Sequence, residues 1–242
     1  MPALRYLLIQ IRDVEDPIRI QEVDCFARSI GCRPDHIRPF DLLTQRLTKT
    51  DLASAHAVLI GGSGNYSAAG DSPWLEHALE DLRLLYELRK PTFASCWGFQ
   101  ALARAMGGRC IHDPDHAELG TIDLQLTAEG MQDPLFGQLQ KPYRGQAGHE
   151  DYVVELPPDA ILLASSKLVK NQAFRLAGAP IYCTQFHPEL DRKFLLQRLE
   201  AYPQYVERIA GTSVEEFARH CVDTPDTRKL LQRFATWVAE TA

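Results

Sequence analysis

Two observations predict an α/β fold in which helices cover both faces of a mostly parallel central sheet. Short, continuous apolar runs alternate with segments of helical period through the first half of the chain. Such alternation is typical of parallel strands joined by helical crossovers. The chain also has 242 residues, of which 45% are hydrophobic and 24% charged, so it can bury one large core without disulfides.

The elements of the first half follow one another in a regular order. Apolar runs predict strands at residues 6–11, 57–60 and 91–95. Apolar side chains that recur every three or four residues predict helices at residues 18–30, 73–90 and 98–106. Gly31 ends the first helix, since glycine readily adopts the left-handed conformation that closes a helix. We therefore expect a doubly wound sheet.

The second half has a different pattern. Polar and apolar residues alternate between Glu118 and Glu155, which predicts antiparallel strands beside the parallel core. Apolar runs at 160–165 and 180–186 follow, and the remaining residues have helical spacing. We expect one domain over residues 1–190 and a helical extension over 191–242 that packs on the same domain.

Charge and hydropathy exclude several classes of function. The formal net charge is −6 at pH 7 and no basic block occurs, so nucleic acid is not an expected partner. No apolar stretch approaches the ~20 residues of a membrane-spanning helix. Gln10 and Arg12 break the N-terminal apolar run, which is unlike a signal peptide. We expect a cytoplasmic protein without a membrane partner.

Cysteine and histidine spacing does not predict a metal site. The six cysteines are scattered along the chain and form no Cys-x-x-Cys pair. His112 and His116 resemble a metal-binding pair by composition, but Pro114 between them prevents a helical i, i+4 arrangement. A solvated loop is the favoured interpretation, and we expect neither a metal nor a cofactor.

Cys96 is located where an apolar strand ends and a helix begins. This layout is typical of a nucleophile elbow, a sharp turn that lifts one side chain clear of the sheet edge. Gly98 has the small size needed where such a turn meets its neighbouring strands. The free N–H groups and dipole of a helix start favour the nucleophilic thiolate. A buried structural residue is the alternative for a lone cysteine.

His187 supplies a base for that cysteine. It follows the apolar run 180–186, and the carboxyl ends of parallel strands share one edge of a sheet, so we expect Cys96 and His187 to meet. Pro188 restricts His187 to an extended backbone. Glu189 is placed to accept the Nδ1 proton and leave Nε2 facing the thiol. The pattern predicts a Cys-His-Glu triad in which His187 acts as base and then as acid.

A glycine-rich turn, Gly61-Gly62-Ser63-Gly64, ends another apolar strand. Glycines let backbone N–H groups approach a ligand closely. No Lys-Ser or Lys-Thr pair follows the turn, which excludes a P-loop. We expect the N–H groups of Gly62 and Trp97 to form an oxyanion hole.

Taken in order, these motifs resemble the class I glutamine amidotransferase family over residues 5–190. That family has a Gly-rich oxyanion strand, an elbow of the form Gly-x-Cys-x-Gly-x-Gln and a late His-Pro-Glu. The matching segments here are Gly61–Gly64, Ala94–Gln100 and His187–Glu189. The segment Gly148–Val153 is similar to the family's Ser-His-x-Asp-x-Val. The nearest members are stand-alone proteins similar to the amidotransferase domain of GMP synthetase.

The resemblance implies a three-layer, flavodoxin-like fold and hydrolysis of the glutamine side-chain amide. It implies that Cys96 attacks the amide, releases ammonia and leaves a γ-glutamyl thioester that water resolves. The residues that it implies hold the substrate are Gly61, Gly64, Gln100, Gly148 and His149. Two positions depart from the family pattern: Ala94 replaces the first glycine of the elbow, and Gly148 replaces serine.

Partners and competing functions follow from what amidotransferases require. The family delivers ammonia to a synthetase, and the segment after Glu189 contains no ATP-binding domain. The partners expected are L-glutamine or a γ-glutamyl amide, with a separate synthetase subunit or a second copy of the chain. Three alternatives stay open: a γ-glutamyl peptide hydrolase, a homoserine-type acyltransferase, whose elbow also reads Cys-Trp-Gly-x-Gln, and a binding protein that has lost catalysis.

Overall fold

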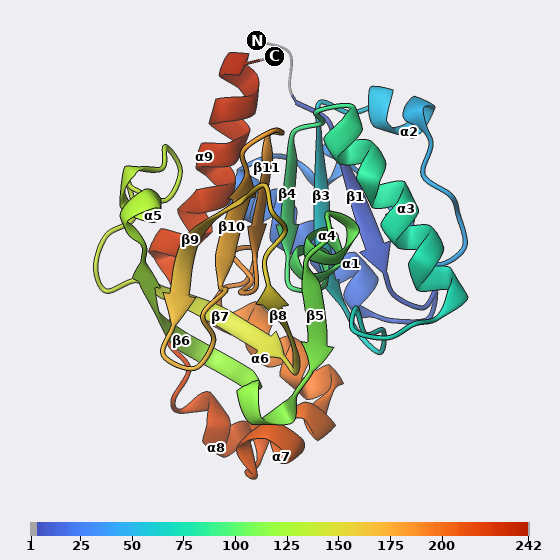
Figure 1. Cartoon of the computed structure of the whole chain (residues 1–242). Helices are drawn as coiled ribbons and strands as arrows, with labels where there is room; N and C mark the ends of the chain where they lie inside the picture. Colours follow the sequence, from blue (N-terminus) through green and yellow to red (C-terminus); the bar gives the residue numbers. More distant parts are fainter. Residues whose placement is uncertain (1–3, 242) are drawn as a thin grey trace.

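A nine-stranded mixed sheet forms the centre of the computed structural model, which describes residues 4–241 (Figure 1). Strands from β2 to β11 run parallel, and every later neighbour is antiparallel. The carboxyl ends of the parallel strands therefore share one edge. Across the sheet, the strands are β2 (Ile37–Asp41), β1 (Tyr6–Ile11), β3 (Ala57–Ser63), β4 (Thr92–Ser95), β11 (Ile181–Thr184), β10 (Ala173–Leu176), β9 (Ala160–Ser166), β6 (Glu118–Leu126) and β7 (Arg144–His149).

Helices cover both faces of the sheet. Leu7 and Ile9 of β1 pack against α3 and α4 on one face, whereas Tyr6 and Leu8 pack with α1 and α9 on the other. Successive side chains of a strand point to opposite faces, so the whole of β1 is buried. The helices are α1 (Ile18–Ile30), α2 (Lys49–Ala53), α3 (Pro73–Glu87), α4 (Trp97–Ala105), α5 (Ala128–Gln132), α6 (Arg192–Ala201), α7 (Pro203–Ala210), α8 (Val214–Ala218) and α9 (Pro225–Thr241).

The last four helices occupy two places. The long α9 packs beside α1 on one face of the sheet. The shorter α6, α7 and α8 gather at the opposite end of the molecule from the C-terminal end of α9 (Figure 1). Their buried side chains Leu195, Leu199 and Val206 form a separate apolar cluster with Leu190 and Cys25. This cluster fixes α6 and α7 over the loop that follows β11.

The predicted fold class is confirmed: the chain has the three-layer, flavodoxin-like α/β arrangement with C-terminal helices. Residues 6–11 and 18–30 form the expected strand and helix, and Gly31 adopts the left-handed conformation with φ of 83°. The antiparallel part of the sheet also includes β9 and β10, which lie outside the alternating segment 118–155. None of the helices in the described residues is long and apolar enough to cross a membrane.

Three short strands were not predicted from the sequence. β2 lies at the sheet edge and contains Pro39, and β10 has only four residues. β5 (Arg109–His112) pairs with β8 (Asp151–Glu155) in a separate two-stranded sheet and is partly exposed. Each is too short or too polar to form a continuous apolar run, so its pairing depends on neighbours distant in the sequence.

Gly98 allows α4 to approach β3, and we expect Gly98→Ala to destabilise the protein by about 1–3 kcal/mol. An alanine Cβ there would lie 2.7 Å from Ile60 Cγ2 and 3.1 Å from Ala94 Cβ. Urea unfolding measures the change, with Gly70→Ala as control because no atom lies within 4 Å of the added Cβ. Equal midpoints for the two variants would contradict the argument.

Candidate active site

Cys96 is located on a strained turn between β4 and α4. Its backbone has φ of 51° and ψ of −104°, a conformation that non-glycine residues rarely adopt. The strain is held in place because the Cys96 N–H donates to the Thr184 carbonyl at 2.8 Å, and Cys96 O accepts from Gln100 N–H at 3.1 Å. The side chain remains 8% exposed. This is the geometry expected of an elbow that presents a thiol at the sheet edge.

The ends of three parallel strands meet at this thiol. A Cβ built on Gly62, at the end of β3, would lie 2.9 Å from His187 Cε1 and 3.6 Å from Cys96 Cβ. His187 follows β11, and its N–H donates to the Gln146 carbonyl at 2.7 Å. A side chain at Gly62 would therefore collide with the imidazole. The glycine turn, the cysteine and the histidine thus come together at one edge of the sheet.

His187 and Glu189 form a buried pair. The Nδ1 atom of His187 lies 2.6 Å from Glu189 Oε1, and both side chains are almost fully shielded from solvent. Burial alone lowers the pKa of His187, but the negative charges of Glu189 and Cys96 outweigh it and raise the pKa from 6.5 to about 9. Burial opposes ionisation of Glu189, yet His187 and Arg198 hold the pKa of that carboxyl below its usual value.

Arg198 of α6 extends this pair into a chain of buried charges. Its Nη1 lies 3.5 Å from both Glu189 Oε1 and His187 Nδ1, and its Nη2 lies 4.0 Å from Oε1 of Glu22, in α1. Glu22 in turn faces Arg12 Nε at 3.5 Å and accepts from Gln10 Nε2 at 3.0 Å. The imidazole is therefore oriented by groups from β1, α1 and α6 together.

This network of buried charges was not predicted from the sequence. Arg198 and Glu22 are separated by 176 positions and belong to helices without a recognisable motif, so no local pattern joins them. The available signal was in β1, where Gln10 and Arg12 interrupt an otherwise apolar run. Buried charged side chains are rare unless paired, so an arginine directly after a fully buried strand implies a buried carboxylate opposite it.

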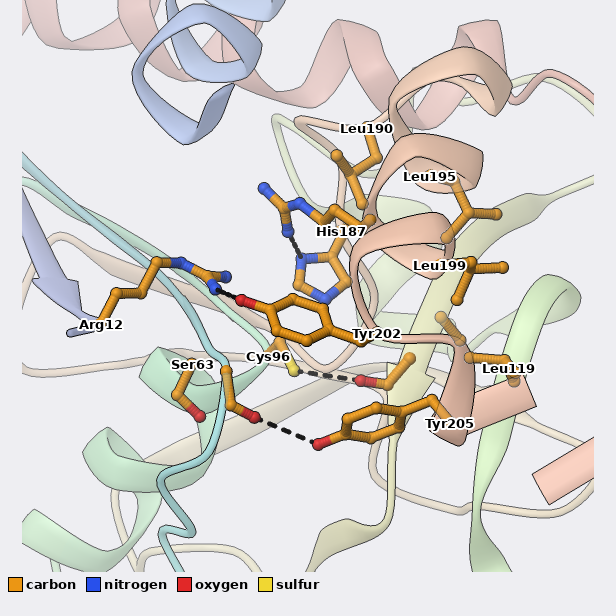
Figure 2. Close-up of a pocket in the computed structure, with 14 residues that line it drawn as sticks. Arg12, Ser63, Cys96, Leu119, His187, Leu190, Leu195, Leu199, Tyr202 and Tyr205 are labelled. Carbon is orange, nitrogen blue, oxygen red and sulfur yellow. Dashed lines mark hydrogen bonds between the residues drawn. The ribbon is translucent and has the colours of Figure 1, made fainter. Parts of the chain in front are cut away.

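Two cavities meet at the thiol. The larger, of about 310 Å³, is lined by polar residues that include Gln100, His149, Glu150 and Arg208, together with the aromatic Trp97. The smaller, of about 70 Å³, lies against His187, α6 and α7 (Figure 2). Cys96, Ser63, Gly64, Gly148 and Tyr205 line both. Tyr205 Oη donates to the Gly64 carbonyl at 3.2 Å and closes the boundary between the cavities (Figure 2).

The remaining residues predicted for the site lie in different surroundings. Gln100 is buried, and its Nε2 donates to Asp151 O at 2.7 Å and to Gln185 Oε1 at 3.2 Å. His149 lines the larger cavity, while its ring is held by Glu118 Oε2 and the Asp151 carbonyl, each at 3.1 Å. Gly61 lines neither cavity, and a Cβ there would collide with the Glu22 carboxylate.

Gly148 contacts Cys96 directly. Its carbonyl lies 3.7 Å from Cys96 Sγ, and it lines both cavities. A Cβ at this position would lie 3.7 Å from Leu119 Cδ1, which is ordinary van der Waals contact. A larger side chain would therefore fit at this position. The family's usual serine is replaced by glycine here, but the contact between the carbonyl of residue 148 and Cys96 Sγ does not depend on the side chain.

The two histidines considered as a metal pair are separated. His112 Nδ1 lies 2.8 Å from Asp151 Oδ1, whereas His116 Nδ1 lies 2.8 Å from Asp113 Oδ2 and its ring stacks on Tyr152. Within residues 4–241, no group of three or more metal-binding side chains comes together. His112 instead lines the larger cavity and orients Asp151.

Comparison with known proteins identifies the family. Residues 27–194 match the model of the family Glutamine amidotransferase class-I. Because this segment is well over half of the chain, the protein belongs to that family. The helices α7, α8 and α9 and most of α6 follow the matched segment.

The related sequences fall into two groups. A glutamine-hydrolyzing GMP synthase of Christiangramia forsetii is 31% identical over 166 residues, which are 67% of this chain but only 30% of that protein. One subunit of the glutamine-hydrolyzing GMP synthase of Pyrococcus abyssi is 33% identical over 43% of this chain and 53% of its own. Gamma-glutamyl peptidase 3 of Arabidopsis thaliana is 27% identical over 74% of this chain and 70% of its own.

Solved structures show the same fold over nearly the full chain. A glutamine amidotransferase of Thermotoga maritima superposes with a TM-score of 0.77 at 20% identity and covers 98% of both chains. A glutamine amido transferase of Methylobacillus flagellatus has a TM-score of 0.69 at 19% identity and covers 97% of this chain and 95% of its own. With such coverage, the likeness in fold includes the helices that follow residue 194.

The buried carboxylate sets the titration of His187. We expect the His187 ring to titrate near pH 9 by NMR, and Glu189→Gln to lower that pKa because burial is then opposed only by the charge of Cys96. Since the pKa is raised in the folded state, the stabilisation from His187 is present below pH 6.5 and is lost as the pH rises through about 9. Glu200→Gln, an exposed change on α6, is the control, and an unchanged pKa in Glu189→Gln would refute the assignment.

Arg198→Met should destabilise the folded protein by about 3 kcal/mol, because it leaves the Glu189 and Glu22 carboxylates buried without a cation between them. Denaturant unfolding at pH 7 measures the loss. Lys193→Met, an exposed change on the same helix, should leave the midpoint unchanged. If both variants unfold at the wild-type midpoint, the guanidinium does not stabilise the network.

Proposed function

We propose that this protein hydrolyses the side-chain amide of glutamine or of a related γ-glutamyl amide through a thioester on Cys96. The observation that carries the proposal is that Cys96, on a strained turn, lies beside the buried pair of His187 and Glu189. In that pair, His187 Nδ1 lies 2.6 Å from Glu189 Oε1. The GMP synthase relatives support glutamine as substrate. The γ-glutamyl peptidase supports substituted amides, and the chain covers more of that relative's length.

In the proposed acylation step, His187 Nε2 holds the proton and Cys96 Sγ attacks the γ-carbonyl carbon as the thiolate. A carbon–sulfur bond forms and the carbon–nitrogen bond breaks, while His187 donates its proton to the departing nitrogen. Glu189 keeps the imidazole in the orientation that leaves Nε2 free, since it occupies Nδ1. A raised pKa of about 9 keeps His187 protonated near neutral pH, as the acid step requires.

The oxyanion of the tetrahedral intermediate needs N–H donors beside Cys96. Trp97 is the first residue of α4, so its N–H has no acceptor within the helix. Gly62 lies across from it at the end of β3, close to both Cys96 and His187. We assign these two N–H groups to the oxyanion hole, where one donor is typically worth about 3–4 kcal/mol. Water then attacks the thioester, gives its proton to His187 and releases glutamate.

The larger cavity supplies groups for the α-amino and α-carboxylate ends of the substrate. The side-chain Nε2 of Gln100 already donates both of its hydrogens, to Asp151 O and to Gln185 Oε1. Its Oε1 is therefore the atom that can accept a hydrogen bond from the ammonium group of the substrate. At the cavity wall, Arg208 Nε lies 2.6 Å from Glu150 Oε1. This pair offers one cation and one anion to a zwitterionic substrate. The larger cavity is therefore assigned to the γ-glutamyl part.

The proposal extends to the compartment and to partners. All six cysteines are free, which is consistent with a reducing compartment such as the cytoplasm. Transfer of ammonia to a separate synthetase subunit would give an amidotransferase, and release to solvent would give a hydrolase. Measurable glutaminase activity of the isolated chain would favour the hydrolase. An acyltransferase would instead acylate Cys96 from an acyl donor and leave glutamine unchanged.

A diazoketone analogue of glutamine tests the site with a single chemical event. We expect its mass adduct at Cys96, protection by excess L-glutamine and no adduct in Cys96→Ala, which should also lose about 10³-fold or more of the hydrolysis rate. Cys110→Ala, which removes another buried thiol, should still be labelled. Intact-protein mass spectrometry measures the adduct, and a coupled glutamate assay measures the hydrolysis rate. Labelling of Cys96 that glutamine does not block would exclude a glutamine site.

A further inference from the structure

The smaller cavity lies on the side of the thiol from which His187 acts. His187 lines that cavity and does not line the larger one, although Cys96 lines both. The imidazole that protonates the leaving nitrogen must lie within hydrogen-bond reach of it. A substrate whose γ-glutamyl part fills the larger cavity therefore directs its nitrogen, and any substituent on that nitrogen, toward the smaller cavity.

The walls of the smaller cavity are suited to an uncharged, apolar group. Four leucine side chains line it, from β6, from the loop after His187 and from α6: Leu119, Leu190, Leu195 and Leu199. Its volume of about 70 Å³ exceeds the space of one water several-fold and has room for only a few non-hydrogen atoms. Ammonia alone would leave most of this apolar space unfilled.

Each arginine at the cavity lies within 4.0 Å of a carboxylate, although Arg12 Nε and Arg198 Nη2 make no hydrogen bond to the described residues. Arg12 donates to Asp16 Oδ2 at 3.0 Å and faces Glu22, while Arg198 lies between Glu22 and Glu189. These two cations and the protonated His187 ring therefore face three carboxylates. A substituent with its own carboxylate would add a fourth negative charge, and its burial without a free cation would be costly.

We propose that the smaller cavity is a subsite for the leaving group. The preferred substrates are γ-glutamyl amides whose nitrogen carries a short, uncharged alkyl group. This inference rests on the proposed Cys96 chemistry and names its substrate class. The γ-glutamyl alkylamide and water give glutamate and the amine: the carbon–sulfur bond forms as the carbon–nitrogen bond breaks, His187 gives its proton to the amine, and water then cleaves the thioester.

Selectivity in this arrangement comes from the C-terminal extension. Leu195 and Leu199 project from α6, and Tyr202 and Tyr205 from the start of α7 complete the wall around Cys96 (Figure 2). Tyr202 is held by Asp16, whose Oδ2 accepts from its hydroxyl at 2.6 Å, and Tyr205 by the Gly64 carbonyl. These four side chains lie beyond residue 194, where the family-matched segment ends, whereas Leu119 and Leu190 lie within it.

The test compares kcat/KM for N-methyl, N-ethyl, N-propyl and N-hexyl amides of γ-glutamate, with L-glutamine and γ-glutamylglycine alongside. The alkylamides have almost the same intrinsic reactivity, so differences among them report on the cavity. We expect a rise of about fourfold per methylene from methyl to propyl, a fall at hexyl and poor turnover of γ-glutamylglycine. A flat or falling series from methyl to propyl, or a preference for γ-glutamylglycine, overturns the inference.

Cavity variants provide a second, independent measurement. Leu199→Ala should shift the optimum toward the hexyl amide, and Leu199→Phe should lower the ratio of propyl to methyl turnover. Val206→Ala is the matched control, because Val206 is buried in the same apolar cluster but does not line the cavity. An unchanged chain-length optimum in both Leu199 variants overturns the inference.

Failure of the inference and failure of the proposed function give different results. If Cys96 is labelled by the glutamine analogue and glutamine is hydrolysed, but alkyl length has no effect, only the subsite assignment is wrong. If Cys96 is not labelled and no γ-glutamyl amide is hydrolysed, both the subsite and the proposed function are wrong.

Discussion

The position of the imidazole depends on one arginine buried between two carboxylates. Arg198 lies 3.5 Å from Glu189 and 4.0 Å from Glu22, so its guanidinium links the loop after β11, which carries Glu189, to α1, which carries Glu22. Buried charges are tolerated only when each has a partner, and this chain of alternating charges satisfies that condition from β1 to α6. The same arginine anchors α6, and with it the leucines that bound the smaller cavity.

Local patterns were sufficient to predict which residues come together at the centre of the candidate site. Cys96, Gly98 and the helix that follows lie within ten residues, and steric rules alone define the place of each. His187 could be placed because parallel strands end at a common edge. Arg198 and Tyr205 could not be placed from the sequence, because their partners Glu22 and Gly64 belong to distant elements. No spacing rule links a C-terminal helix to a glycine turn. The short strands β2, β5 and β10 were missed for the same reason.

The two groups of relatives are named for different substrates: the GMP synthases for hydrolysis of glutamine, and the peptidases for cleavage of γ-glutamyl peptides. In this chain the region beside His187 is enclosed by α6 and α7, and four leucines line it. The larger cavity, by contrast, is lined mainly by polar groups that can recognise a zwitterion. The two sides of the thiol are therefore chemically distinct, and under the proposed function this asymmetry determines which bond of the substrate faces His187.

The hydrogen bond from Tyr205 to the Gly64 carbonyl joins two parts of the chain that are 141 residues apart in the sequence. The strands that carry Cys96 and His187 all precede α6 and α7 in the sequence. A chain released from the ribosome in order can thus assemble its sheet while the wall between the cavities is still missing. In that intermediate the thiol is open on one side and Glu189 lacks its guanidinium. The ion pair of Glu189 and the apolar wall beside Cys96 are therefore completed only when α6 and α7, which α8 and α9 follow in the sequence, pack against the sheet.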